Sequence, residues 1–121
     1  MRNILMIISA LLVSCASLTF DAGEFDRFTS MKHMSDSLIS ECGTPSINKS
    51  VDELYIITEH QFEYTAHRPG RAQITKATAD VFIMTASLKQ HVGEYSKIYC
   101  QEKLKNISAG TAIIIHTIGD M

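Results

Sequence analysis

Five histidines are the side chains in this chain best suited to metal or acid–base chemistry. They are His33, His60, His67, His91 and His116. A zinc site needs ligands at short, fixed spacing, such as His-x-x-x-His, and no two of these histidines are placed in that way. We therefore expect no metal site.

Patterns typical of nucleophilic catalysis or nucleotide binding are also missing from the sequence. No serine lies in a Gly-x-Ser-x-Gly motif, and no glycine-rich loop could hold a phosphate. The acid pairs Asp52/Glu53 and Glu59/Glu63 could do acid–base work only if a cleft brought them together, and solvated faces are the simpler interpretation. We expect no catalytic residue, no cofactor, no small-molecule ligand and no enzymatic activity.

Covalent chemistry of another kind is indicated at the N-terminus. Arg2 is followed by an apolar run that ends at Val13, with no acidic residue before Asp21. A run of roughly ten apolar residues is too short to span a membrane, which takes about twenty. The pattern predicts a secretory signal over residues 1–14 that is removed from the mature protein.

The residues that close this run, Leu12-Val13-Ser14-Cys15, resemble the lipobox of bacterial lipoproteins. The resemblance implies that the Cys15 thiol carries a diacylglyceryl group, that the leader is cut before it, and that the new amino group is acylated. Two or three acyl chains make a stable anchor, whereas one holds only marginally. Because Ala16 and not Asp follows the cysteine, the resemblance also implies the outer membrane, facing the periplasm. The alternative is an ordinary signal peptide cut after Ala16.

With Cys15 assigned to lipid, Cys42 and Cys100 are the only remaining thiols. An even pair in an exported protein is usually a disulfide, and a bridge over this loop would stabilise the fold by about 4 kcal/mol. Two buried free thiols are the alternative.

Composition limits both the partners and the number of domains. The formal net charge is −2, from 11 Lys and Arg against 13 Asp and Glu. Neither nucleic acid nor an anionic membrane surface is therefore an expected partner. After residues 15–23, the lipidated cysteine and its tether, the segment 24–121 has the length of one domain.

Two helices are expected in that domain. The first covers residues 24–42, with Asp21 as its cap and Gly43-Thr44-Pro45 as its stop. The second covers 81–104, where apolar residues recur three or four positions apart.

Strands are expected at 54–58, 61–65, 72–76 and 111–118, which are rich in β-branched or aromatic residues, with a turn at Arg68-Pro69-Gly70-Arg71. The predicted fold class is α+β: a small three- to four-stranded, mostly antiparallel sheet packed against two helices.

This order of elements resembles small periplasmic lipoprotein domains, among them the α/β-type pilotins of type II secretion. The matching residues are Val51, Asp52, Phe62, Glu63, Tyr64, Cys100, Leu104, Gly110, Gly119 and Asp120. The chain departs from that pattern because no cysteine follows the last strand and Cys42 stands near the first helix instead. The resemblance implies a non-enzymatic, lipid-anchored domain that binds or assembles another envelope protein. An inhibitor or immunity lipoprotein, with loop 67–71 plugging a hydrolase or toxin, is the alternative.

Overall fold

The computed structural model describes residues 20–91, 94 and 96–121, and these fold into helices. The α-helices are α2 (Ala22–Leu38), α3 (Ile47–Ala66), α4 (Ala72–His91) and α5 (Lys97–Gly119), and a 3₁₀ helix, η1 (Ile39–Glu41), follows α2. The described residues contain no β-strand. The predicted α+β fold with a three- to four-stranded sheet is therefore wrong.

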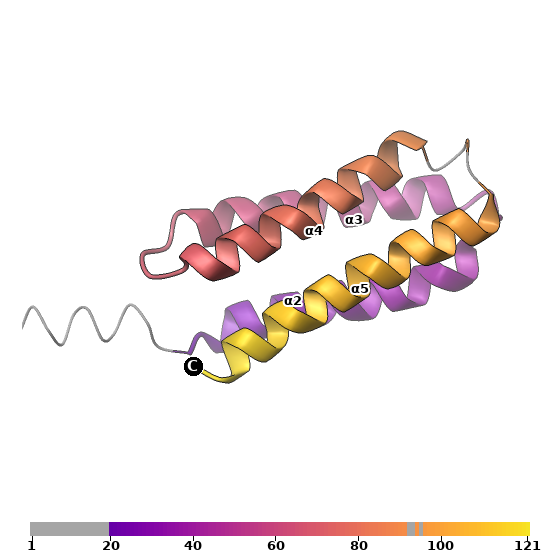
Figure 1. The fold of residues 1–121 in the computed structure, drawn as a ribbon. Helices are drawn as coiled ribbons and strands as arrows, with labels where there is room; N and C mark the ends of the chain where they lie inside the picture. The colour runs from indigo at the N-terminus through magenta and orange to yellow at the C-terminus, as the bar shows by residue number, and fades with distance from the viewer. Residues whose placement is uncertain (1–19, 92–93, 95) are drawn as a thin grey trace, which may run out of the picture.

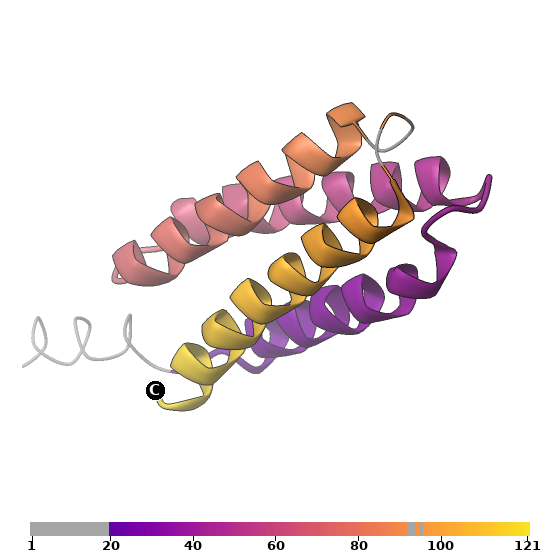
Figure 2. The same cartoon turned by 45° about the vertical axis from the view of Figure 1, so that its right-hand side comes forward.

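Successive helices run in opposite directions and form an antiparallel four-helix bundle (Figure 1). Helix α2 packs closely on α5 and α3 packs closely on α4; contacts between α2 and α3 are the sparsest of the neighbouring pairs (Figure 2). The start of α2, the end of α5 and the α3–α4 turn share one end of the bundle. We call it the terminal end, and the opposite end the disulfide end.

Each helix turns one row of side chains inward, with the alternating four- and three-residue spacing of a heptad. In α3 the row is Ile47, Val51, Leu54, Thr58, Gln61 and Thr65, and in α5 it is Cys100, Leu104, Ile107, Thr111, Ile114 and Ile118. The rows of α2 and α4 keep this spacing from Glu24 and from Arg71. Such spacing is typical of helices that pack at the small crossing angles of four-helix bundles.

Hydroxyl side chains occupy many of these interior positions. Ser35, Thr78, Thr85 and Thr111 are buried, and each donates a hydrogen bond to the backbone carbonyl four residues earlier, at 2.6 to 2.9 Å. The bond satisfies the hydroxyl inside its own helix, so no polar partner is needed across the core. The interior rows therefore contain many polar side chains, although they form the packed core of the bundle.

The predicted strands lie in helices α3, α4 and α5. Their β-branched residues favour strands in isolation, but packing of a complete interior row overrides this preference. In residues 111–118 the isoleucines were expected to be buried on both faces of a strand. Instead, Ile114 is buried while Ile113 is 65% exposed, as neighbours on an amphipathic helix are. The strand arrangement of α/β-type pilotins is thus not present in the described residues.

The helix predicted over 81–104 is also wrong in its extent. Helix α4 ends at His91, and α5 begins at Lys97 with the hydroxyl of Ser96 accepting a hydrogen bond from the Tyr99 backbone. Three local predictions are confirmed. Asp21 caps α2 by accepting from the Glu24 backbone, α2 and η1 together cover most of 24–42, and a turn joins α3 to α4 with Gly70 at a φ of 76°.

Candidate functional site

The predicted lipidation site, Cys15, lies outside the described residues, as do the leader 1–14 and most of the tether. The described chain begins at Phe20, whose ring lies 5.5 Å from that of Phe25 in the first turns of α2. The tether therefore reaches the bundle at the terminal end.

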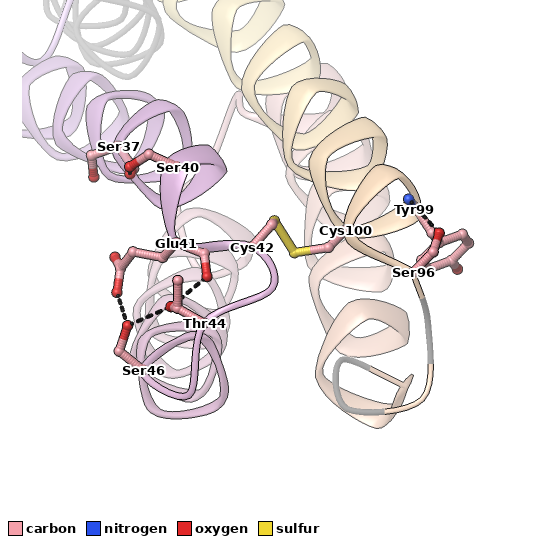
Figure 3. Close-up of a disulfide and its surroundings, with 9 residues drawn as sticks. All are labelled: Ser37, Ser40, Glu41, Cys42, Thr44, Ser46, Ser96, Tyr99 and Cys100. Atoms are coloured by element: carbon pink, nitrogen blue, oxygen red, sulfur yellow. Dashed lines mark hydrogen bonds between the residues drawn. A yellow bond between two sulfur atoms is a disulfide. The ribbon is translucent and has the colours of Figure 1, made fainter.

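Cys42 and Cys100 form a disulfide in the structure (Figure 3). Their sulfur atoms are 2.03 Å apart, and both residues are almost fully buried. Cys42 follows η1, and Cys100 lies in the first turn of α5. The bond thus ties the end of one helix to the beginning of its antiparallel neighbour at the disulfide end.

Hydrogen bonds around Glu41 hold the turn that positions Cys42 (Figure 3). The Thr44 hydroxyl donates to the Glu41 carbonyl at 2.6 Å, and the Ser46 hydroxyl donates to the Glu41 carboxylate at 2.8 Å. The Ser50 hydroxyl, one turn into α3, donates to the same carboxylate oxygen at 3.0 Å. Gly43 has a φ of 86°, a conformation that other residues adopt with strain.

The other residues considered for chemistry are dispersed. In residues 20–91, 94 and 96–121 no three His, Cys, Asp or Glu side chains are grouped so that they could hold a metal ion. The acid pairs Asp52/Glu53 and Glu59/Glu63 lie on the outer side of α3, and none of the four lines the hollows beside that helix described below.

Loop 67–71, the plug of the inhibitor hypothesis, is held by ion pairs at the terminal end. Arg68 Nη1 pairs with Asp21 and lies 3.3 Å from the Glu24 carboxylate, while Arg71 Nε lies 3.2 Å from the other Glu24 oxygen. Glu24 and Arg71 are fully buried side chains. The backbone hydrogen bond from Glu24, assisted by the charge of Arg68, lowers the pKa of Asp21. Both arginines of the loop therefore point toward the bundle and bind it.

Several large apolar side chains of α3 are exposed to solvent. Ile56, Ile57 and Tyr64 are 52%, 43% and 44% exposed, and Tyr55 and Phe62 are half-buried beside them. We call these five residues the α3 face. The apolar side chains of α3 are therefore not confined to its interior row, as they would be on an ordinary surface helix of a bundle.

On the α4 side, the α3 face continues into an aromatic groove. The ring of Phe82 from α4 stacks against Tyr55 and Phe62, with centroids 5.4 and 5.8 Å apart. Hollows of about 530 and 560 Å³ lie on either side of this stack. Small side chains of α4, Ala79 and Ala86, line them and leave room for side chains of another molecule.

On the α2 side, a second groove of about 520 Å³ follows the loosely packed α2–α3 junction. Ile57 and Tyr64 line it from α3, and Ser30 and Arg27 line it from α2. The Arg27 guanidinium lies 4.4 Å from the Tyr64 ring centroid, and its Nε donates to the Gln61 side chain at 2.9 Å. The short Ser30 side chain keeps the groove open.

Acidic residues surround the α3 face. Asp52, Glu53, Glu59 and Glu63 all lie on the outer side of α3, and the sequence has no Lys or Arg between Lys49 and Arg68. Within the described part of the chain, no ion pair involves any of the four carboxylates. A hydrogen bond to Glu59 raises the pKa of the neighbouring Tyr55 hydroxyl.

The strand interpretation of residues 54–65 concealed this face. In a strand, Tyr55 and Ile57 would share one side and Ile56 the other, which suits a sheet buried on both faces. In a helix the same residues fall outside the interior row: Tyr55 stacks on Phe82 of α4, and Ile56 and Ile57 stay exposed. The row of buried residues from Ile47 to Thr65 in the structure distinguishes the two arrangements.

No helix in the described part of the chain is long and apolar enough to cross a membrane. Comparison with known proteins finds no matching family model, no similar curated protein and no similar solved structure.

Proposed function

We propose that this protein is a lipid-anchored, non-enzymatic binding domain of the bacterial cell envelope, and that it binds another envelope protein through the α3 face. The anchor is the Cys15 lipid, which the lipobox-like Leu12-Val13-Ser14-Cys15 supports. A disulfide between Cys42 and Cys100 agrees with an oxidising compartment such as the periplasm.

The observation that carries the binding proposal is the exposure of Ile56, Ile57 and Tyr64 on one helix. Several large apolar side chains exposed on one helix indicate an interaction site, whereas single exposed apolar residues are ordinary. On α5, by contrast, the exposed Ile98 and Ile113 stand about four turns apart and line none of the described grooves.

Photo-crosslinking in living cells tests this proposal. A benzoylphenylalanine at position 56 of the full-length protein is expected to form a specific adduct with an envelope protein. The matched control is the same residue at position 113, because Ile113 is also an exposed isoleucine in a helix and is 65% exposed against 52% for Ile56. Equal adducts from both positions, or none from position 56, would contradict binding through the α3 face.

A further inference from the structure

The α3 face combines apolar side chains with a net negative charge on the same helix. Ile56 lies between Asp52 and Glu59 along the helix, and Glu53 and Glu63 extend the acidic surface on either side of it. Of the described cations nearby, Arg27 lies over the Tyr64 ring, Lys89 Nζ lies 4.3 Å from the Tyr55 ring centroid, and Lys49 lies one turn before Glu53, so four carboxylates on α3 stand against one lysine of the same helix. An occupant must therefore supply both apolar surface and positive charge.

The shape of the surface selects a helix as that occupant. The two grooves flank α3 on its α2 and α4 sides and follow the helix axes. Twenty residues of α3 give a surface about 30 Å long at about 1.5 Å per residue. An amphipathic helix laid alongside α3 would place apolar residues against it at every third or fourth position.

From these observations we propose that the partner binds through a basic amphipathic helix, with lysines or arginines flanking its apolar row. The inference rests on the proposed function and specifies the chemistry of the partner. The positive charges of the partner helix would steer it toward the carboxylates of α3 and fix its position along α3. The apolar contacts would contribute most of the affinity.

Two other occupants fit the surface less well. An anionic lipid surface would be repelled by the four carboxylates on α3. A second copy of the chain could offer the cations of α5, among them Lys105, but α3 and α5 are diagonally opposite in the bundle (Figure 2). A contact between those two surfaces would be head-to-tail and would build open assemblies rather than a closed dimer.

Peptide binding to the full-length mature lipoprotein in phosphatidylcholine nanodiscs tests the inference, with empty nanodiscs as the blank. The probe is a fluorescent 18-residue helix of leucine and lysine, and the comparison peptide has glutamate in place of lysine. We expect binding of the lysine peptide only. Replacing Glu53 and Glu63 by Lys should weaken it roughly ten-fold, since each exposed charge contact contributes a few-fold in affinity.

The matched control is Asp80→Lys with Asp120→Lys, which changes the net charge equally on other surfaces and should alter the affinity less than about two-fold. Equal weakening by both double variants would overturn the inference, and so would binding of the glutamate peptide. Another outcome is that the wild-type protein forms assemblies that grow with its concentration and that the Glu53→Lys/Glu63→Lys variant does not form. That result would identify a second copy of the chain as the occupant and would overturn the inference. If position 56 crosslinks in cells while the peptides show no charge preference, the proposed function stands and this inference fails.

Discussion

Arg71 Nε lies 3.2 Å from Glu24 Oε1, and both side chains are completely buried at the terminal end of the bundle. The pair joins the first turn of α2 to the residue that precedes α4, two elements diagonally opposite in the helix order. Arg68 approaches the second Glu24 oxygen at 3.3 Å, so the carboxylate has a cationic neighbour at each oxygen.

Breaking this pair should destabilise the fold strongly. Glu24→Gln or Arg71→Met should each lower the free energy of unfolding by about 3 kcal/mol, because each removes one member of a buried ion pair and leaves the other charge in the core. Replacing both residues by leucine should be less harmful than the sum of the single losses. Urea unfolding measures all three. Single variants within about 1 kcal/mol of wild type would show that water reaches these groups.

Removing the disulfide should lower the free energy of unfolding by about 4 kcal/mol, because the bond closes a loop with a sequence separation of 58 residues. Cys42→Ser with Cys100→Ser is the variant, and thermal unfolding is the measurement. Alkylation followed by mass spectrometry, with and without reductant, reports the bond directly. Two cysteines modified without reductant would refute it.

Asp36 on α2 should make a small, pH-dependent contribution to the free energy of unfolding. Its carboxylate accepts hydrogen bonds from Lys32 and from Ser108 on α5, and these lower its pKa below 3.8. The stabilisation by Asp36 is therefore complete at a pH above the ordinary value of 3.8. It is lost as the pH falls through the lowered pKa of the folded protein. Asp36→Asn should cost about 0.5 kcal/mol at pH 7, and the difference from wild type should shrink below about pH 4. An undiminished difference at pH 2 would contradict this account; Asp80→Asn serves as control.

Gly110 permits close contact between α5 and α4. A Cβ atom at this position would lie 3.1 Å from Val81 Cγ2 and 3.3 Å from Met84 Cε. Gly110→Val should therefore destabilise the bundle by about 2 kcal/mol through overpacking. Ala109→Val, at the exposed neighbouring position of the same helix, controls for β-branching and should cost less than about 1 kcal/mol. Equal unfolding midpoints for the two variants would exclude close packing at Gly110.

The lipid anchor has a separate test. Cells fed an alkyne-labelled fatty acid should label the wild-type protein, and Cys15→Ser should abolish the label, since the thiol is the acylated group in the lipobox interpretation. Retention of the label by Cys15→Ser, or no label on either protein, would refute acylation at this residue.

Local features of the fold could be predicted from the sequence, because a few neighbouring residues determine them. Asp21 caps α2 by accepting a hydrogen bond from the backbone of Glu24, three residues later. Gly70 supplies the positive φ of the α3–α4 turn. For Cys42 and Cys100 the sequence leaves two alternatives, a disulfide or two buried free thiols. The bond requires the end of α2 and the beginning of α5 to lie side by side, which depends on the tertiary fold.

Helix α3 could not be predicted by the same approach, because its interior and exterior residues reverse the usual pattern. Thr58, Gln61 and Thr65 face inward, where the apolar periodicity of a helix is normally sought. Ile56 and Ile57 face outward and complete a run of β-branched and aromatic residues typical of a strand. The α3 face could not be predicted for the same reason, because a strand pattern places its side chains in a sheet core.

An even number of antiparallel helices returns the chain to the end where it began. Phe20 and Met121 therefore share the terminal end, and α3 runs from the disulfide end toward it (Figure 1). If the bundle stands on a lipid attached near Phe20, the α3 face is presented sideways, along the height of the domain, and not at its tip. A partner would then approach parallel to the membrane plane, so that neighbours anchored in the same leaflet would reach it more readily than molecules diffusing from the periplasm.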